Sequence, residues 1–156
     1  MKFKIILAVF SLLYTLRSMD SHEIKERTLL EPVNFSSLKF QEGERTVLWN
    51  NLFQPDRPLI FFLIYYKCPS ICNTQLNSFF KAVNEYGLLP GKDFELAVLS
   101  FDYKETPELA DKKKNAYLQE FEKAGKKPEF HFLTGTKENI QTVTDSLRFT
   151  YYWNEK

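Results

Sequence analysis

Two cysteines separated by three residues, Cys68 and Cys72, are the side chains of this sequence best suited to chemistry. They flank a short Pro69-Ser70-Ile71 segment that directly follows a long apolar run. Two thiols this close can form a disulfide when oxidised, or converge on one metal ion when reduced. Soft thiolates select Cu(I) over harder cations. The spacing therefore predicts a redox pair or a copper site, and it leaves both open.

A purely structural disulfide is the main alternative, because exported proteins commonly carry one. A bridge that closes so short a loop gains little stability in the chain-entropy model, so a functional pair is favoured. A structural zinc site needs four ligands, and the chain adds only His22 and His131, without paired spacing. Zinc is therefore disfavoured, and neither histidine is a good metal ligand by itself.

The elements around the cysteines predict where they lie. The apolar run at 59–66 is typical of a strand covered on both faces, and a second such strand spans 94–101. A helical pattern follows the cysteines and ends at Tyr86-Gly87. We expect Cys72 inside this helix and Cys68 near its N-terminus, which lowers a thiol pKa and favours the thiolate.

The other elements complete an alternating order of strands and helices. They are a β-hairpin within 35–49, a helix starting at Thr106-Pro107, a strand at 129–133, a helix capped by Thr136, and a further strand beginning at 149–153. This order predicts an α/β domain with a largely parallel sheet. The cysteines then lie at the carboxyl edge of the sheet, where such folds place their sites.

The N-terminus has the layout of an export signal. Two lysines precede an apolar run from Ile5 to Leu16, which is shorter than a comfortable bilayer span. No small-x-small cleavage site follows, so 1–18 is interpreted as a signal peptide or a short membrane anchor, with a buried strand or helix as the alternative. Residues 19–34 form a polar linker and 35–156 the domain. We expect an exported protein, periplasmic or anchored facing the periplasm.

Charge gives no reason to expect nucleic acid as a partner, since the formal net charge is +1. The basic run at 112–114 is surrounded by acidic residues, which predicts a solvated helix face. A composition with 44% hydrophobic and 26% charged residues is that of one globular domain.

Longer stretches around these features resemble the Sco/SenC family. The C-P-x-x-C spacing separates this family from thioredoxins, which carry C-x-x-C. The resemblance runs from about Phe35 to the C-terminus and rests on four stretches: Tyr65-Tyr-Lys-Cys-Pro-Ser-Ile-Cys-Asn73, Leu88-Leu-Pro-Gly-Lys-Asp-Phe94, Leu99-Ser-Phe-Asp-Tyr-Lys-Glu-Thr-Pro-Glu-Leu-Ala110 and His131-Phe-Leu-Thr-Gly135.

The resemblance implies a thioredoxin-like fold and a copper chaperone. Family members help assemble the dinuclear copper centre of cytochrome c oxidase, and some reduce cysteines of the target. By position, Cys68 and Cys72 would be the thiolate ligands of Cu(I), and Asp102 would lie behind them without touching the metal. The implied partners are the oxidase subunit with the dinuclear centre and other copper or thiol carriers. Whether this chain is a metallochaperone or a thiol–disulfide oxidoreductase stays open.

One feature of the family is missing from the sequence. The third copper ligand of the family is a histidine in a His-Pro segment after the last helix, and this chain ends at Lys156, where that segment should begin. His131 matches a position that is not a ligand. We therefore expect a domain without its last strands and with two of three ligands. A fragment, a truncated reading frame and a divergent member all fit this ending, and a non-functional truncated remnant is an alternative to both functions.

Overall fold

The structure is a computed structural model that describes residues 35–123 and 125–152. The expected signal or anchor, the linker and His22 lie outside the described residues. The elements follow in the order β1 (Lys39–Glu42), β2 (Arg45–Leu48), a 3-10 turn η1 (Trp49–Asn51), β3 (Leu59–Ile64), α2 (Ile71–Glu85), β4 (Glu95–Ser100), α3 (Pro107–Lys123), β5 (His131–Leu133) and α4 (Lys137–Ser146). Within these ranges no helix has the length and apolar character to cross a bilayer.

A three-stranded parallel sheet in the order β3-β4-β5 forms the centre of the domain. β1 and β2 form the expected antiparallel hairpin. Its first strand joins the sheet beside β5, because Gln41 and Thr134 exchange backbone hydrogen bonds of 2.8 and 3.0 Å. The predicted alternation of strands and helices is thus confirmed, and the hairpin extends the sheet at one edge.

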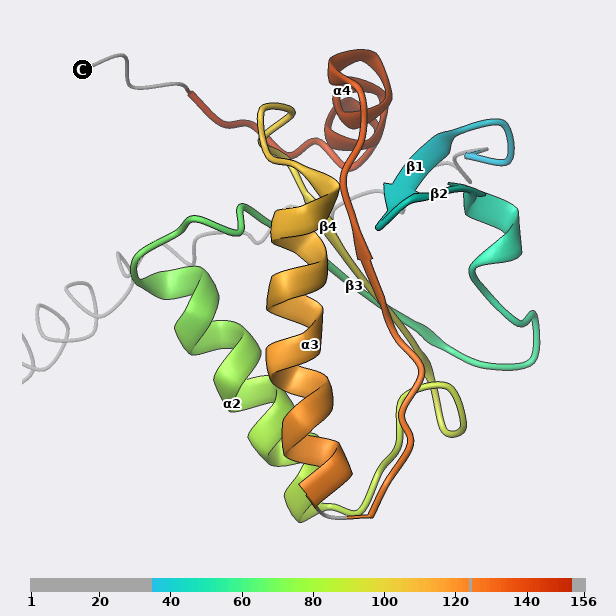
Figure 1. The fold of residues 1–156 in the computed structure, drawn as a ribbon. Helices are drawn as coiled ribbons and strands as arrows, with labels where there is room; N and C mark the ends of the chain where they lie inside the picture. The colour runs from blue at the N-terminus through green and yellow to red at the C-terminus, as the bar shows by residue number, and fades with distance from the viewer. Residues whose placement is uncertain (1–34, 124, 153–156) are drawn as a thin grey trace, which may run out of the picture. The chain divides into compact units, whose positions relative to one another are not determined.

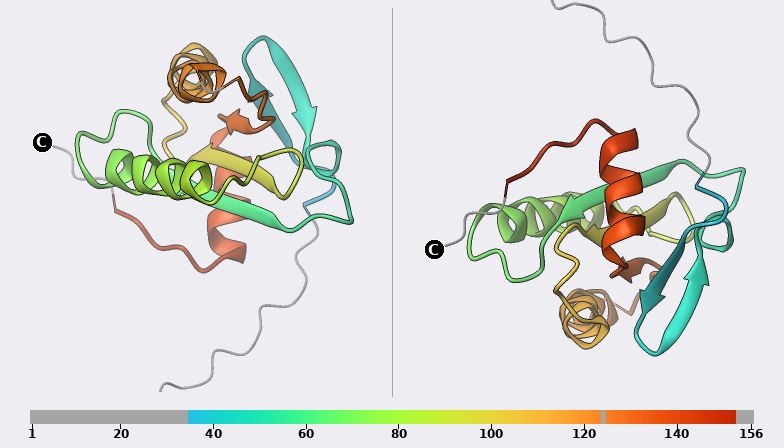
Figure 2. Two further views of the ribbon diagram at one scale, coloured as in Figure 1. Left: turned by 90° about the horizontal axis from the view of Figure 1, so that it is seen from below. Right: turned by 90° about the horizontal axis from the view of Figure 1, so that it is seen from above.

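The central strand β4 is buried along its whole length, so its alternating side chains enter two separate cores. Leu96 and Val98 pack with side chains of α2 and α3 on one face. Ala97 and Leu99 pack on the other face with the hairpin and α4. Figure 1 and the two views of Figure 2 show α3 and α4 on opposite sides of the sheet. This layering leaves the carboxyl ends of β3 and β4 free to carry loops.

The strand expected at 149–153 does not form over its described residues, 149–152. After α4, Arg148 adopts a left-handed conformation with φ of 51°, which turns the chain. Phe149 and Tyr151 then both pack on the ring of Phe101, at centroid distances of 5.3 and 5.0 Å. The apolar pattern that predicted a strand therefore serves an aromatic cluster instead.

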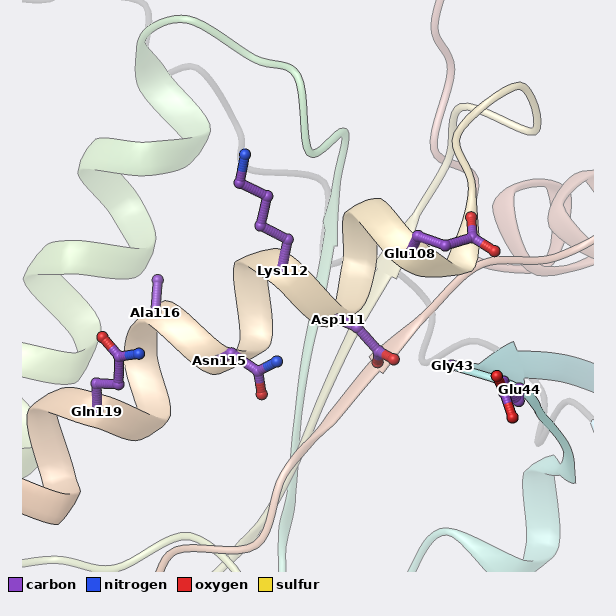
Figure 3. A pocket seen from close by; sticks show the side chains of 8 residues that line it. All are labelled: Gly43, Glu44, Glu108, Asp111, Lys112, Asn115, Ala116 and Gln119. Atoms are coloured by element: carbon purple, nitrogen blue, oxygen red, sulfur yellow. The ribbon is translucent and has the colours of Figure 1, made fainter.

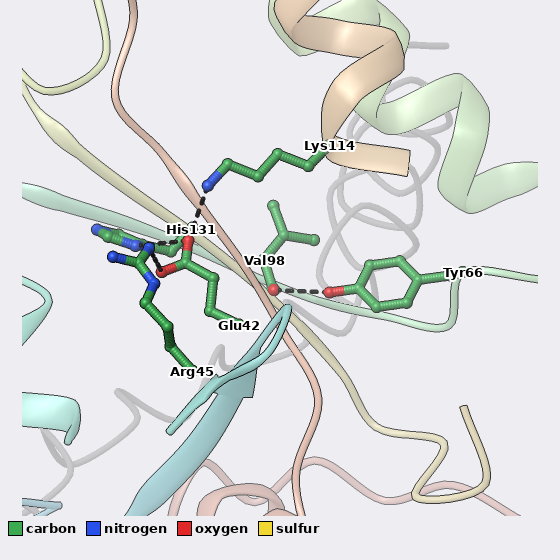
Figure 4. A network of polar contacts seen from close by, with 6 residues as sticks. All are labelled: Glu42, Arg45, Tyr66, Val98, Lys114 and His131. Atoms are coloured by element: carbon green, nitrogen blue, oxygen red, sulfur yellow. Dashed lines mark hydrogen bonds and ion pairs between the residues drawn. The ribbon is translucent and has the colours of Figure 1, made fainter. Parts of the chain in front are cut away.

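A buried carboxylate ties the hairpin to the rest of the domain. Glu42, 5% exposed, accepts 2.8 Å from Lys114 Nζ of α3 and lies 3.0 Å from His131 Nδ1 of β5. Arg45 donates to its second oxygen at 3.2 Å (Figure 4). Burial raises the pKa of Glu42, but the contacts with His131 and Lys114 outweigh it and lower the pKa from 4.5 to about 2. The cluster therefore favours the folded hairpin while Glu42 is ionised.

This cluster predicts an acid-sensitive part of the stability. Glu42 binds protons more weakly in the folded chain than in the unfolded chain. Its contribution to stability is therefore complete above about pH 4.5 and is lost as the pH falls towards about 2. Between about pH 6 and about pH 3, the free energy of unfolding of the wild type should fall by about 2 kcal/mol more than that of Glu42→Gln. Urea unfolding of both proteins at the two pH values measures this difference. Equal losses would contradict the role given to Glu42.

Candidate functional site

Cys68 and Cys72 lie where the chain leaves the sheet and enters its first long helix. β3 ends at Ile64, residues 65–70 form a loop, and α2 begins at Ile71. Cys72 is therefore inside the helix, as predicted, and Cys68 lies in the loop before it. Both are free thiols and both are buried, 4% and 7% exposed. Their burial keeps the sulfurs away from bulk water while leaving them at the carboxyl edge of the sheet.

The two thiols differ in acidity. Burial opposes ionisation of Cys68, but backbone N–H groups of Cys72 and Ser70, with the Cys72 thiol and the Tyr65 hydroxyl, lower the pKa of Cys68 to about 7. Burial, together with the hydrogen bond to Cys68, raises the pKa of Cys72. The helix N-terminus thus acts on Cys68 as predicted. At neutral pH the pair readily holds one thiolate beside one thiol.

The loop before Cys68 is held by a carboxylate from another part of the chain. Glu105, 5% exposed, lies in the loop between β4 and α3. Its two oxygens accept the backbone N–H groups of Tyr66 at 2.6 Å and Lys67 at 2.7 Å, and the hydroxyl of Ser100 at 2.6 Å. Charge-assisted bonds of this kind are the strong ones, so Glu105 fixes the backbone immediately before Cys68.

A lysine from α3 holds the same loop by one of its carbonyl groups. Lys113 Nζ donates to the backbone oxygen of Tyr66 at 3.3 Å and to the side-chain oxygen of Asn73. Asn73 in turn donates 2.9 Å to the backbone oxygen of Cys68. The prediction of a solvated face at 112–114 is therefore wrong for two of its three lysines. Lys113 binds the thiol loop and Lys114 binds Glu42, because both point from α3 towards the body of the domain.

The side chain of Tyr66 anchors the loop to the sheet. Its hydroxyl lies 3.0 Å from the backbone oxygen of Val98 and 2.8 Å from that of Leu133, and its ring stacks on Phe132. Tyr66 is 3% exposed. The backbone N–H, the backbone oxygen and the hydroxyl of Tyr66 each have a partner in another part of the chain. These contacts leave the loop little freedom.

Sequence reasoning missed Glu105, Lys113 and Tyr66. A signal existed for Glu105, since it follows the carboxyl end of a buried strand, the edge where the cysteines were expected. Lys113 gave no such signal, because its neighbours Lys112 and Lys114 have the same residue type and different surroundings.

The remaining predicted site residues are placed as follows. Asp102 follows β4 at the carboxyl edge, and its side chain accepts the backbone N–H of Lys104 at 2.9 Å. Its place behind the copper ligands stays a prediction. His131 contacts Glu42 and not the cysteines in any described contact. Among the described residues, no group of three or more histidine, cysteine, aspartate or glutamate side chains could hold a metal ion.

A cleft of about 580 Å³ lies apart from the thiols, between the hairpin turn and the outer surface of α3 (Figure 3). Gly43 and Glu44 line one side of it, and Asp111 and Lys112 are among its α3 residues. Neither cysteine lines this cleft.

Comparison with known proteins identifies the family. The family model described as SCO1/SenC matches residues 45–156. The chain belongs to the SCO1/SenC family. Among curated proteins, none matches this chain. The predicted Sco/SenC membership is confirmed, and the matched range includes both cysteines and the loop that holds them.

Solved structures with the same fold include other Sco proteins. A proposed electron transfer protein from Aquifex aeolicus VF5 aligns at 22% identity and TM-score 0.62, over 76% of this chain and 66% of that one. Arabidopsis thaliana ScoI with copper bound aligns at 23% identity and TM-score 0.53, over 74% and 66%. Yeast Sco1 with copper bound aligns at 19% and 0.53, over 80% and 65%. The thioredoxin-like fold with an N-terminal hairpin is confirmed.

The acidity of the thiols in this Sco-family site can be measured directly. As the pH of the reduced protein rises, thiolate absorbance near 240 nm should increase in two steps. The first should have a midpoint near 7, because backbone N–H groups lower the pKa of Cys68, and the second should lie above 9.0, because burial raises the pKa of Cys72. A single step at or above 9.0 would contradict this site.

Proposed function

We propose that this chain is a copper-binding assembly factor that holds Cu(I) on Cys68 and Cys72 and delivers it to cytochrome c oxidase. Membership of the SCO1/SenC family supports a copper-related assembly role. The observation that carries the proposal is a pair of free thiols at one strand–helix junction, with the pKa of Cys68 lowered to about 7. Cu(I) is the cargo of such a site.

The donor set fits Cu(I) better than other common ions. Thiolate sulfur is the soft ligand that Cu(I) favours, whereas zinc sites usually need four ligands. The buried position of both sulfurs reduces contact with water, which protects a thiolate site from oxidation. Two thiolates are the ligands that the described residues offer, and an ion held by them would accept a donor from another molecule, which suits a carrier that must release its ion.

The expected partners and place follow from the same proposal. The receiving protein is the oxidase subunit that carries the dinuclear copper centre, and other copper or thiol carriers load or reduce the pair. Delivery to such a centre is consistent with the export signal expected at 1–18, on the periplasmic side of a membrane. These partners and this location are part of the proposal.

The unequal acidity of the thiols favours a second candidate function, thiol–disulfide reduction. The Cys68 thiolate would attack one sulfur of a target disulfide, forming a mixed disulfide and releasing the other target sulfur as a thiolate. Cys72, once deprotonated, would then attack the Cys68 sulfur, closing the Cys68–Cys72 disulfide and freeing the second target thiol. The target gains two electrons and this chain loses two. A low-pKa thiol beside a high-pKa partner suits these two roles.

Titration with a calibrated Cu(I) chelator tests the copper proposal. The reduced wild type should bind about one Cu(I) per chain, while Cys68→Ser and Cys72→Ser should each weaken binding by at least about 100-fold, because one sulfur is left. His131→Gln is the matched control and should bind as the wild type does, since His131 contacts Glu42. No competition by the wild type would refute copper binding. A loss in His131→Gln equal to that in the cysteine variants would refute the ligand assignment.

Turnover with a disulfide substrate tests the second candidate separately. If this chain is a reductant, it should reduce a mixed-disulfide or peptide-disulfide substrate in the absence of copper. In the Cys72→Ser variant the reaction should stop at a mixed disulfide trapped on Cys68. Mass spectrometry identifies the trapped species. Copper binding without any turnover assigns the site to metal delivery, and turnover without copper binding assigns it to reduction.

A further inference from the structure

The backbone from Tyr66 to Cys68 has an unusual set of hydrogen-bond partners. It belongs neither to β3 nor to α2, so its amide and carbonyl groups cannot pair within a sheet ladder or a helix. The Cys68 N–H donates to the backbone oxygen of Tyr65 at 3.2 Å, and side chains bind four of the other groups. Glu105 accepts hydrogen bonds from two backbone amides of the loop, and Lys113 donates to one backbone carbonyl. Asn73 donates to the carbonyl of Cys68.

These three side chains form one connected arrangement, which we call the loop clamp: Glu105, Lys113 and Asn73. Glu105, which is negative, accepts hydrogen bonds from N–H groups, and Lys113, which is positive, donates to a C=O group. The charge of each side chain therefore suits the peptide groups that it binds. Lys113 and Asn73 also bind each other, so the carbonyl side of the clamp joins α3 to the first turn of α2. That turn contains Cys72. The clamp therefore ties the backbone of Cys68 to the helix that carries Cys72.

We propose that the loop clamp positions the two thiols relative to each other, and that it thereby sets the Cu(I) affinity and the dithiol–disulfide equilibrium of the pair. None of its members supplies a sulfur ligand, and each acts through the backbone of the cysteine loop. This inference rests on the proposed function of the thiol pair. It goes further by assigning the site's geometry to three residues outside the C-P-x-x-C motif.

A merely structural role would give a different pattern. If the clamp only stabilises the domain, its loss should lower the free energy of unfolding and leave the properties of the folded thiol pair unchanged. If it positions the thiols, folded variants should bind Cu(I) more weakly and should also show faster amide exchange at residues 65–70, since a hydrogen-bonded backbone exchanges slowly. The two readouts together separate these roles.

The test uses matched substitutions in the full chain. Lys113→Met removes the donor while keeping the length of the side chain, and Lys113→Arg restores a cationic donor. Asn73→Leu breaks the link to Cys68 without changing net charge, so it separates the clamp from a simple charge effect. Lys112→Met removes the same charge from the adjacent, exposed residue and is the control. Urea unfolding first confirms that each variant is folded.

We expect Lys113→Met and Asn73→Leu each to raise the Kd for Cu(I) by about tenfold, the scale of one lost hydrogen bond at a charged or tightly held group. Both should shift the dithiol–disulfide equilibrium in glutathione buffers and increase hydrogen exchange at 65–70. Lys113→Arg should recover most of each effect, and Lys112→Met should match the wild type. Glu105→Gln should show the larger exchange increase, and if it does not fold, the Lys113 and Asn73 variants carry the test.

The outcomes keep this inference distinct from the proposed function. If the wild type binds no Cu(I), the copper proposal fails, and the glutathione equilibrium and hydrogen exchange still decide the role of the clamp. Folded Lys113→Met and Asn73→Leu proteins with unchanged exchange would overturn the inference. Faster exchange with an unchanged Cu(I) Kd and an unchanged dithiol–disulfide equilibrium would also overturn it, because the clamp would then be structural only.

Discussion

The buried carboxylate of Glu105 binds backbone N–H groups of the loop between β3 and α2. Where β3 ends and α2 has not yet begun, the chain passes through a loop with backbone N–H groups that have no ladder or helix partner. Leaving such groups unpaired costs about 1–3 kcal/mol each. Glu105 accepts two of them and is itself held by Ser100 at the end of β4. A side chain from the neighbouring crossover therefore helps to fix the position of the thiol loop.

The same arrangement explains why Cys68 can be both buried and acidic. Burial alone would raise its pKa, and hydrogen bonds from the backbone of Cys72 and Ser70, with those from the Cys72 thiol and the Tyr65 hydroxyl, turn the balance the other way. Those donors reach the sulfur only if the loop keeps its path into the helix. Reactivity at the cysteine thus depends on backbone geometry, and backbone geometry depends on side chains that never touch the sulfur.

Much of this architecture could be predicted from the sequence. The apolar run at 59–66 and the proline-hydroxyl start at 106–107 are local signals, and they predict a strand and a helix start correctly. The aromatic tail at 149–152 does not form the predicted strand, because alternation in a short apolar stretch fits a strand and also fits a segment packed on the ring of Phe101. Only tertiary structure decides between the two.

The site was predictable to the extent that its chemistry is local. Cys68 and Cys72 stand close together in sequence, whereas the contact from Glu105 to Tyr66 spans 39 residues and that from Lys113 to Asn73 spans 40. Lys112, Lys113 and Lys114 are identical in sequence terms, yet a helix turns by about 100° per residue and sends them in different directions. One reaches the thiol loop, one reaches Glu42 and one faces solvent. Composition and motif spacing cannot separate such residues. A motif locates the reactive atoms, whereas the residues that position them depend on which elements the fold brings together.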